Sequence, residues 1–556
     1  MENIRNRYLG EIYTPKHISN LLYEITNKYI PNFNMTHTVW DCCWGTGNLT
    51  EDIEFVDLYV STLRALDIRK NNRKNPTAKK FAYDFLEDDI EQLVSQQAMW
   101  VKEHKMPEDL LDKLNGDKPI LFYINPPYVG TGVYGTNNTD FKDGATDSAV
   151  KEIMRQHVLG SACDQTYTQF LYRIYLMKEA YRNKNISIAV ICPPTFLSAT
   201  TYKNFRDKFL KSFKFMGGAL FQASEFSGLS IEWGITIQVW SPGETVDKKN
   251  FIFDAYEWCE DGQFRKTGEK NIYNIDGEIP GVDWIKSTIN GFPQIMSNIT
   301  LSSGCKMSNK KPVSTVPNAL GYFYYKGNSV YHNEQECGIM SLPYSNGGGT
   351  PIIESNFDKV IAMFTARRAF SRYGSTWKNN KDEYLVPNEN SDAYKTLLMN
   401  GYIYALFNGS SNMTSLILDT DEGKLEVPNH FFFLSAAQMK QLLDSVGLPV
   451  IGPGRFEDRL MYKKLQTAFQ SGLLVDKAIQ VYNAWVGAWV KTMPLRVDFH
   501  RRYPEFQVLN WDASFYQIRQ IVKDNNIKDF AELNGLYREF EDSIRELVYD
   551  AGFLRK

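Results

Sequence analysis

The sequence is poor in the features that mark secreted, metal-binding and membrane proteins. Its 556 residues include only seven cysteines and seven histidines, with no Cys-x-x-Cys spacing and no histidine cluster. An odd, scattered set of cysteines predicts free thiols in a cytoplasmic protein and argues against a structural zinc site. No apolar run approaches the ~20 residues that span a bilayer, and the polar N-terminus lacks a secretion signal. We therefore expect a cytoplasmic protein with no membrane partner and no metal.

Composition and charge leave the choice of partner open. Hydrophobic residues make up 43% and charged residues 23% of the chain, an ordinary globular balance. A chain of this length exceeds one compact core, so several domains are expected. The net charge of -3 neither requires nor excludes a nucleic acid, because a basic groove can coexist with an acidic surface.

The chain changes character along its length, which predicts three regions. Up to residue 243 short apolar runs alternate with helix-like stretches, the pattern of a doubly wound, Rossmann-like α/β sheet. The expected strands are 38–40, 63–66, 81–83, 120–124, 186–191, 219–221 and 234–240. Residues 244–455 are rich in aromatic residues, Asn and Gly and predict an α+β region, and residues 456–556 read as helical.

The sharpest motif is Asn125-Pro126-Pro127-Tyr128, directly after the apolar run 120–124. Open α/β sheets bind ligands at the carboxyl ends of their strands, where this motif is expected to lie. The prolines stiffen the backbone and leave only carbonyl groups. The Asn125 side-chain oxygen and the Pro126 carbonyl can accept both hydrogens of an exocyclic amino group, and Tyr128 offers a flat face to a planar base or amide. The structural alternative is a tight turn after a strand.

A second motif joins a strand to a glycine turn. In Asp41-Cys42-Cys43-Trp44-Gly45-Thr46-Gly47 the acid ends the strand, and the glycines let the backbone approach a ligand closely. Asp67 and Asp84 end the next two expected strands, in positions suited to a ribose and to an adenine amino group. Each acid alone is more typical of a solvated strand end, but their order indicates a nucleoside cofactor.

A third motif, Tyr13-Thr14-Pro15, precedes the first strand. A threonine cap followed by proline is a good helix start. The same geometry leaves backbone N–H groups free to hold a carboxylate.

Taken in chain order, the motif at Tyr13, the motif at Asp41, Asp67, Asp84 and the motif at Asn125 resemble the gamma class of DNA adenine-N6 methyltransferases, over roughly residues 8–240. The resemblance implies transfer of a methyl group from S-adenosylmethionine to N6 of an adenine flipped out of double-stranded DNA. It implies a bacterial or phage-encoded protein, with a restriction partner as one biological setting. The target-recognition region of this class follows the catalytic part, which assigns it here to residues 244–455.

The resemblance also assigns roles to individual residues. Those expected to line the methionine end of the cofactor are Tyr13, Thr14, Asp41, Gly45 and Gly47. Asp67 would hold the ribose and Asp84 the adenine, with Phe85 packing on its ring. Those expected to hold the flipped base are Asn125, Pro126, Pro127, Tyr128 and Phe226. Trp44 and the Cys42-Cys43 pair depart from the residues usual in this class.

Two clusters in the second half are candidates for DNA contact. Arg367, Arg368 and Arg372 lie among aromatic residues, a pattern suited to phosphate or guanine recognition. A solvated helix face with aromatic packing explains this cluster equally well. Lys306, Lys310 and Lys311 lie in an expected loop and are candidates for phosphate contact.

Other functions remain open at this point. A release-factor glutamine methyltransferase shares Asn-Pro-Pro-Tyr, although such enzymes are about half as long and carry almost nothing after the catalytic domain. RNA adenine methylation is a further alternative, as is a DNA-binding protein that kept the fold without turnover. Few residues precede Thr14-Pro15, so we expect an autonomous methyltransferase without a fused nuclease or a separate specificity subunit.

Overall fold

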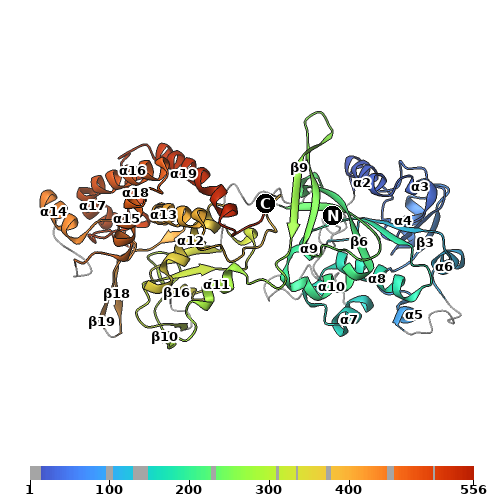
Figure 1. Cartoon of the computed structure of the whole chain (residues 1–556), viewed down its shortest axis with the longest axis horizontal. Coiled ribbons are helices and arrows are strands. Elements are labelled where there is room, and N and C mark those ends of the chain that lie inside the picture. Colours follow the sequence, from blue (N-terminus) through green and yellow to red (C-terminus); the bar gives the residue numbers. More distant parts are fainter. Residues whose placement is uncertain are drawn as a thin grey trace. The chain divides into compact units, whose positions relative to one another are not determined.

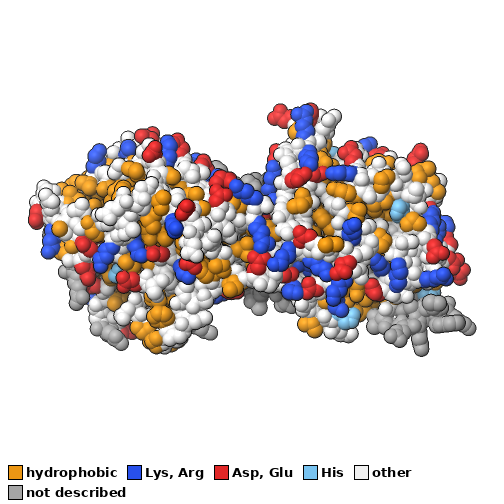
Figure 2. All heavy atoms as spheres, in the orientation of Figure 1, with side chains coloured by type: hydrophobic (Ala, Val, Ile, Leu, Met, Phe, Trp, Pro, Cys, Tyr) orange, Lys and Arg blue, Asp and Glu red, His pale blue; other side chains and the backbone are white. Residues whose placement is uncertain are grey.

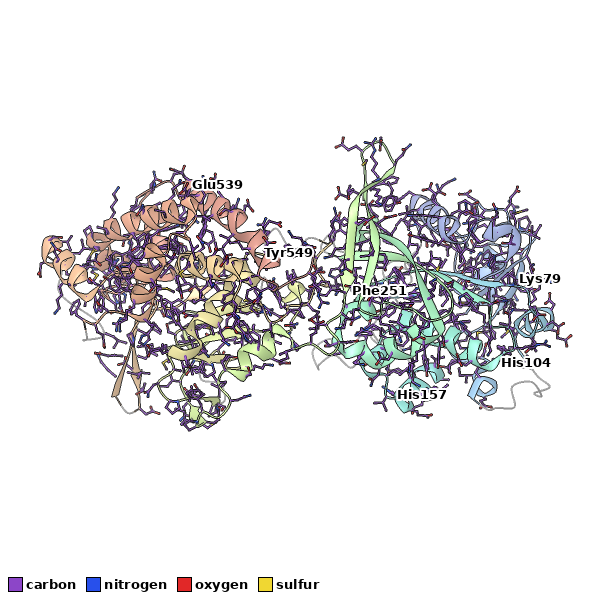
Figure 3. All side chains as sticks on the ribbon, viewed as in Figure 1. Lys79, His104, His157, Phe251, Glu539 and Tyr549 are labelled. Carbon is purple, nitrogen blue, oxygen red and sulfur yellow. The ribbon has the colours of Figure 1, made fainter. Side chains whose placement is uncertain are left out.

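The computed structural model describes residues 14–94, 104–128, 148–226, 233–308, 312–333, 336–370, 377–421, 423–447, 456–504 and 508–556. The chain forms two compact units, which Figure 1 shows. Unit 1 comprises Met1–Gly277, Thr376–Glu383 and Lys556, and unit 2 comprises Glu278–Ser375 and Tyr384–Arg555. Each unit has its own core of buried aromatic and aliphatic side chains, and Figure 3 labels one of them, the fully buried Phe251 of unit 1.

Unit 1 is built on a nine-stranded sheet with the order β3-β2-β1-β4-β5-β7-β6-β8-β9. Its strands are β1 Thr38–Asp41, β2 Leu58–Thr62, β3 Lys79–Ala82, β4 Ile120–Ile124, β5 Ile186–Cys192, β6 Phe213–Gln222, β7 Gly234–Pro242, β8 Asn250–Trp258 and β9 Phe264–Tyr273. The five strands from β3 to β5 run parallel, and β7 is antiparallel to both β5 and β6. This order confirms the doubly wound α/β fold.

Helices cover both faces of this sheet, which is why β1, β2, β4 and β5 are buried at every position. The helices are α2 Lys16–Tyr29, α3 Phe33–Thr36, α4 Ala65–Lys70, α5 Ile90–Val94, α6 Glu108–Asn115, α7 Ala149–Gln156, α8 Thr166–Ala180, α9 Thr195–Ser198 and α10 Lys203–Ser212. Alternate residues of β4 enter different cores: Phe122 packs with the α8 side, and Leu121 with the α2 side.

The prediction for the second strand was wrong. The strand is β2, Leu58–Thr62, and not residues 63–66, where Leu63 and Leu66 are 65% and 54% exposed. The observed strand β2 contains polar residues, which can be buried because they are hydrogen-bonded. Trp40 Nε1, for example, donates to Ser61 Oγ at 3.1 Å. Apolar content alone therefore pointed to the wrong segment.

Unit 2 combines a small sheet with a helical layer. The sheet has the order β16-β14-β15-β17, and three two-stranded ribbons pair β10 with β13, β11 with β12 and β18 with β19. The strands are β10 Ile295–Ser297, β11 Thr300–Leu301, β12 Met307–Ser308, β13 Val313–Thr315, β14 Gly321–Tyr325, β15 Cys337–Met340, β16 Thr350–Ile352, β17 Ser411–Asn412, β18 Leu416–Thr420 and β19 Gly423–Val427.

Apart from α17, whose Phe499 packs in a small separate cluster with Val508 and Ile521, the helices of unit 2 share one large core with the small sheet. They are α11 Gly281–Ser287, α12 Phe357–Arg368, α13 Asp392–Phe407, α14 Ala436–Val446, α15 Leu460–Gln470, α16 Asp476–Thr492, α17 Arg496–Arg502, α18 Phe515–Asp524 and α19 Phe530–Asp550. Capping boxes begin α14 at Ser435 with Gln438 and α18 at Ser514 with Gln517. None of the described helices has the length and apolar character needed to cross a bilayer.

The borders of the compact units differ from the predicted region borders at 243 and 455. The strands β8 and β9 lie beyond residue 243 and continue the sheet of unit 1. The helices α15, α16, α18 and α19, all after residue 455, pack in the same core as α12 and α13, and the whole stretch after residue 455 up to Arg555 belongs to unit 2. Strand pairing and shared packing are long-range properties, which a local change in composition does not report.

Candidate active site

The Asn-Pro-Pro-Tyr motif follows the central strand β4, as the sequence predicted. Asn125 Nδ2 donates a hydrogen bond to Thr14 Oγ1 at 2.8 Å, although the two residues are 111 positions apart. The Tyr128 hydroxyl donates to Asn125 Oδ1 and lies 3.3 Å from the Ile191 carbonyl oxygen. Both ends of the Asn125 amide therefore have a partner, and the group is held in one orientation.

Two aromatic rings stand beside this amide. The Tyr128 and Phe226 rings are 6.4 Å apart at an interplanar angle of 79°, so the contact is edge to face. Phe226 is fully buried and Tyr128 is half-buried. Burial raises the pKa of the Tyr128 phenol well above its ordinary value, which keeps the hydroxyl neutral at physiological pH. The structure thus brings together the residues expected to hold a base.

Asp41, at the end of β1, has the most perturbed carboxyl group of the site. Its Oδ1 accepts the Cys43 backbone N–H at 3.1 Å, and its Oδ2 has no hydrogen-bond partner among the described residues. Burial raises the pKa of this carboxyl to about 7, because an ionised form would be left without water or a counter-charge. A buried carboxylate with one unpartnered oxygen suits a cationic ligand. Since β1 and β4 are adjacent, Asp41 and Asn125 follow neighbouring strands.

The glycine turn is shaped by Trp44. Gly45 and Gly47 have φ values of +52° and +78°, a region that other residues avoid. A Cβ atom at Gly47 would lie 2.8 Å from the Trp44 indole, which is buried in the α2-side core and donates from Nε1 to Thr50 Oγ1 at 3.2 Å. Trp44, which departs from the residue usual in the class that the sequence resembles, therefore packs against the glycine turn and supports it.

We expect Gly47→Ala to destabilise unit 1 by roughly 1–3 kcal/mol, because the new methyl group meets the indole at a strained φ. Gly277→Ala is a matched control, since Gly277 has a φ of +80° and no atom within 4 Å of the added Cβ. Urea unfolding followed by tryptophan fluorescence measures both losses. Equal losses in the two variants would show that the indole contact contributes nothing.

Asn48 and Lys74 also belong to the site, although neither was predicted from the sequence. Asn48 Nδ2 donates to the Thr14 carbonyl at 3.3 Å, and Lys74 Nζ donates to Asn48 Oδ1 at 2.7 Å. Thr14 thus links the glycine turn to Asn125. The position of Asn48, directly after Gly47, was the available signal. Tyr13 lies outside the described residues.

The acids expected to bind the nucleoside have partners of their own. Asp67 lies in the first turn of α4, where its Oδ2 accepts from Arg64 Nε at 2.9 Å. Asp84 follows β3 and accepts the Leu86 N–H at 3.0 Å. Phe85 is buried, with its ring stacked on Phe170 at 5.3 Å. The ribose and adenine contacts of these residues stay predictions.

Arg367 was expected to contact DNA, and the structure corrects this expectation. It is fully buried on α12, where Nη1 donates to the Gly327 carbonyl at 3.1 Å and the guanidinium lies 5.2 Å from the Tyr384 ring centroid. Arg368 is half-buried and donates to the Asn333 carbonyl. Most of α12 is packed in the core of unit 2, so Arg367 lacks the exposure that DNA contact requires.

The remaining candidates are only partly described. Lys306 is exposed in the turn between β11 and β12. Arg372, Lys310 and Lys311 lie outside the described residues.

We expect Arg367→Met to destabilise unit 2 by roughly 2–4 kcal/mol, since buried carbonyl groups would lose their donor. The same change at the exposed Arg501 of α17 should alter stability by less than about 0.5 kcal/mol. Thermal unfolding measures both. Folded Arg367→Met should bind duplex DNA as the parent does, and a selective loss of DNA affinity would contradict the structural role.

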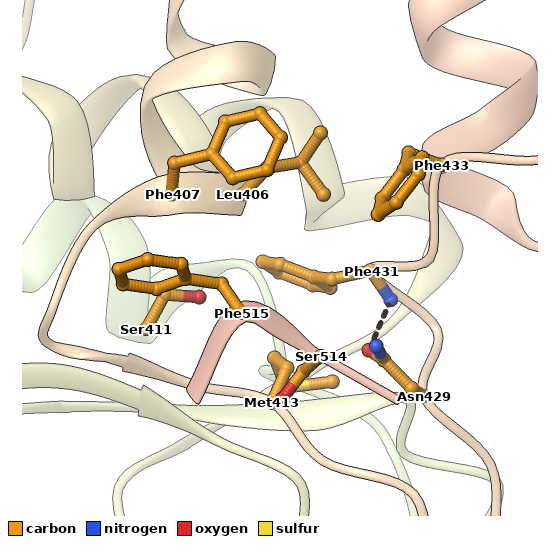
Figure 4. A pocket seen from close by; sticks show the side chains of 9 residues that line it. All are labelled: Leu406, Phe407, Ser411, Met413, Asn429, Phe431, Phe433, Ser514 and Phe515. Carbon is orange, nitrogen blue, oxygen red and sulfur yellow. Dashed lines mark hydrogen bonds between the residues drawn. The ribbon is translucent and has the colours of Figure 1, made fainter. Parts of the chain in front are cut away.

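A pocket in unit 2 offers no second site. Figure 4 shows its lining, which is mostly aromatic: Leu406, Phe407, Ser411, Met413, Asn429, Phe431, Phe433, Ser514 and Phe515. Its polar side chains are those of Ser411, Asn429 and Ser514, and Asn429 Oδ1 accepts the Phe431 N–H at 3.0 Å. The space holds about one water molecule, so we interpret it as a packing gap. Among the described residues no group of His, Cys, Asp and Glu is placed to hold a metal ion.

Comparison with known proteins gives weak structural likenesses. No protein-family model matches the sequence, and no curated protein does. The ATP-dependent Type ISP restriction-modification enzyme LlaBIII bound to DNA is 9% identical, with a TM-score of 0.35 over 83% of this chain and 46% of that one. The M protein of the Type I restriction enzyme EcoKI is 12% identical, with a TM-score of 0.27 over 45% and 50%.

A putative class I S-adenosylmethionine-dependent methyltransferase from Listeria monocytogenes is 14% identical, with a TM-score of 0.26 over 44% of this chain and 65% of that one. The chain thus covers less than two thirds of each of these proteins. Identities and TM-scores this low assign no function to the chain.

Proposed function

We propose that this protein transfers a methyl group from S-adenosylmethionine to N6 of adenine in double-stranded DNA. The observation that carries the proposal is the pairing of two groups at the ends of β1 and β4. One is the buried, half-unpartnered carboxyl of Asp41, and the other is the fixed amide of Asn125 beside two aromatic rings. A cation site next to a site for a planar amine is what methyl transfer to a nucleobase needs.

The residues around Asp41 fit the cofactor. The unpartnered Asp41 Oδ2 can accept from an ammonium group or lie against a sulfonium, and either would restore its missing counter-charge. Thr14, Gly45 and Gly47 would line the same end of the molecule, while Asp67 and Asp84 would face its nucleoside. When bound, the cofactor supplies an electrophilic methyl group.

The residues around Asn125 fit the amino group of a flipped adenine. Asn125 Oδ1 and the Pro126 carbonyl accept its two hydrogens, which aims the nitrogen lone pair along a fixed direction. The amide oxygen has two lone pairs, so it can accept the amino group by sharing or by releasing the Tyr128 hydroxyl. The Tyr128 and Phe226 rings then contact the base, and catalysis consists mainly of positioning.

Methyl transfer by the purified chain alone tests the proposal. The chain receives S-adenosylmethionine with a tritiated methyl group and, in separate reactions, duplex DNA, RNA and a bacterial protein extract. We expect label in duplex DNA as N6-methyladenine, without any added specificity subunit. Label in RNA or in polypeptide glutamine would replace the proposal, and DNA binding without transfer would indicate a binding protein that lost turnover.

A further inference from the structure

The longest stretch of the chain without an acidic residue lies in unit 2, at residues 284–333. Acidic residues number 65 among 556, so a stretch of 50 would be expected to hold about six. This one holds none, and it carries five lysines: Lys286, Lys306, Lys310, Lys311 and Lys326. Lys286 pairs with Asp283 and Lys326 with Glu336, and Lys310 and Lys311 lie outside the described residues. Because carboxylates repel a polyanion, the exposed Lys306 is the described lysine of this stretch best suited to a phosphate group.

Much of this stretch forms one hairpin. The chain runs outward through β10 and β11 and returns through β12 and β13, with Ile295 opposite Thr315 and Leu301 opposite Met307. The turn carries Lys306, and it is fixed to the unit because Thr414 Oγ1 donates to the Gly304 carbonyl at 2.8 Å. This hydrogen bond thus anchors the hairpin to the rest of unit 2.

The β10–β13 end of the hairpin is exposed on both faces. Neighbouring strand residues point to opposite faces, yet Ile295 is 46% and Met296 is 62% exposed. Phe292, just before β10, is exposed as well. Figure 2 shows orange side chains in the part of unit 2 where Figure 1 labels β10. A two-stranded ribbon is marginal by itself, and apolar residues on both of its faces indicate a binding surface.

The chemistry of this ribbon fits the DNA major groove. That groove admits a two-stranded β-ribbon, in which apolar side chains contact thymine methyl groups. Gln294 and Ser314, bonded to each other at 2.8 Å, place an amide and a hydroxyl on the same ribbon, and such groups recognise base edges. The apolar residue Leu301 of the β11–β12 end is buried against Leu416 of the β18–β19 hairpin, so contact with the bases belongs at the exposed β10–β13 end.

We propose that the β10–β13 ribbon enters the major groove of duplex DNA. Met296 contacts thymine methyl groups there, from the ribbon face that also carries Gln294 and Ser314, and Lys306 contacts a backbone phosphate. This inference rests on the proposed function only in taking DNA as the polyanion. It assigns recognition of the DNA sequence to the hairpin and not to Arg367 and Arg368 of α12.

Three variants of the full chain test the inference through DNA affinity. Lys306→Gln should weaken binding to every duplex and lower the slope of log affinity against log salt by about one. Met296→Ser should weaken binding to thymine-containing duplexes and leave uracil-containing duplexes nearly unaffected, because uracil lacks the 5-methyl group. Ile295→Ser, on the opposite face of the ribbon, should bind both duplexes as the parent does. The parent should prefer thymine by about fourfold for each methyl contact.

Exposed residues elsewhere in unit 2 give matched controls. Lys523→Gln in α18 and Val497→Ser in α17 should bind both duplexes as the parent does. The inference is overturned if Met296→Ser and Lys306→Gln also bind like the parent, if the parent binds no duplex, or if these variants change only self-association. Methyl transfer is measured separately, so a parent that binds through the hairpin without methylating DNA would refute the proposed function alone.

Discussion

Asn125→Ala is expected to lower the rate of methyl transfer to duplex DNA by roughly 10²- to 10³-fold, the range found when one fixed polar contact to a reacting group is removed. The physical reason is positional. The Asn125 amide is held between Thr14 and Tyr128, and its oxygen is the side-chain acceptor beside the β4 turn. Binding of S-adenosylmethionine, measured by calorimetry, should change little, because Asp41 and the glycine turn are intact.

Two neighbouring changes separate the roles of the groups around this amide. Thr14→Val removes only the bond to Asn125 Nδ2, so we expect a loss of about tenfold through looser positioning. Tyr128→Phe keeps the ring that contacts the base and removes the hydroxyl that occupies Asn125 Oδ1, and it should be milder than Tyr128→Ala. Activity of Asn125→Ala within a few fold of the parent would remove the amide from the mechanism.

The sequence predicted those parts of the site that depend on short-range order. Residues 120–124 form a strand with the predicted limits, and the Asn-Pro-Pro-Tyr turn lies at its carboxyl end. A strand that is apolar at every position and ends at two prolines leaves little freedom for another conformation. The end of β1 at Asp41 was predicted within one residue, because the Gly45 to Gly47 turn follows it closely.

The parts that sequence reasoning missed depend on contacts between distant segments. Thr14 and Asn125 are bonded across 111 positions, and no local pattern reports that bond. Arg367 lies in a cluster of basic and aromatic residues, for which a DNA surface and a solvated helix face were expected, whereas the structure buries it in a helix core. Only the packing around α12 shows that Arg367 is buried, because burial depends on the segments that pack against a helix and not on the local composition of that helix.

The second large effect concerns Asp41 and the pH dependence of folding. The pKa of its carboxyl is about 7 in the folded protein, against an ordinary value of 3.8. Between about pH 4 and pH 7 the folded protein keeps a proton that the unfolded chain has released. The free energy of unfolding should therefore fall as pH rises through this window, by roughly 4 kcal/mol in total, and level off above pH 7. Asp41→Asn should remove this contribution, which urea unfolding at several pH values would show.

The same carboxyl makes cofactor binding pH-dependent in the opposite direction. A cation at Oδ2 favours the ionised form, so binding below pH 7 must release the Asp41 proton. We expect affinity for S-adenosylmethionine to rise about tenfold per pH unit up to about pH 7 and then to level off. Calorimetry in buffers of different ionisation enthalpy should detect about one released proton at pH 6 and almost none at pH 8.

Two comparisons decide what Asp41 contacts. S-adenosylhomocysteine keeps the ammonium group and lacks the sulfonium charge, so an equal pH dependence for both ligands would place Asp41 at the ammonium. A dependence confined to S-adenosylmethionine would place it at the sulfonium. Asp41→Asn should abolish the dependence, whereas Asp52→Asn, an exposed acid paired with Lys16, should retain it. Parent affinity that stays constant from pH 6 to pH 8 would show that the buried carboxyl does not face the cofactor, because a cation cannot approach Oδ2 without drawing off its proton.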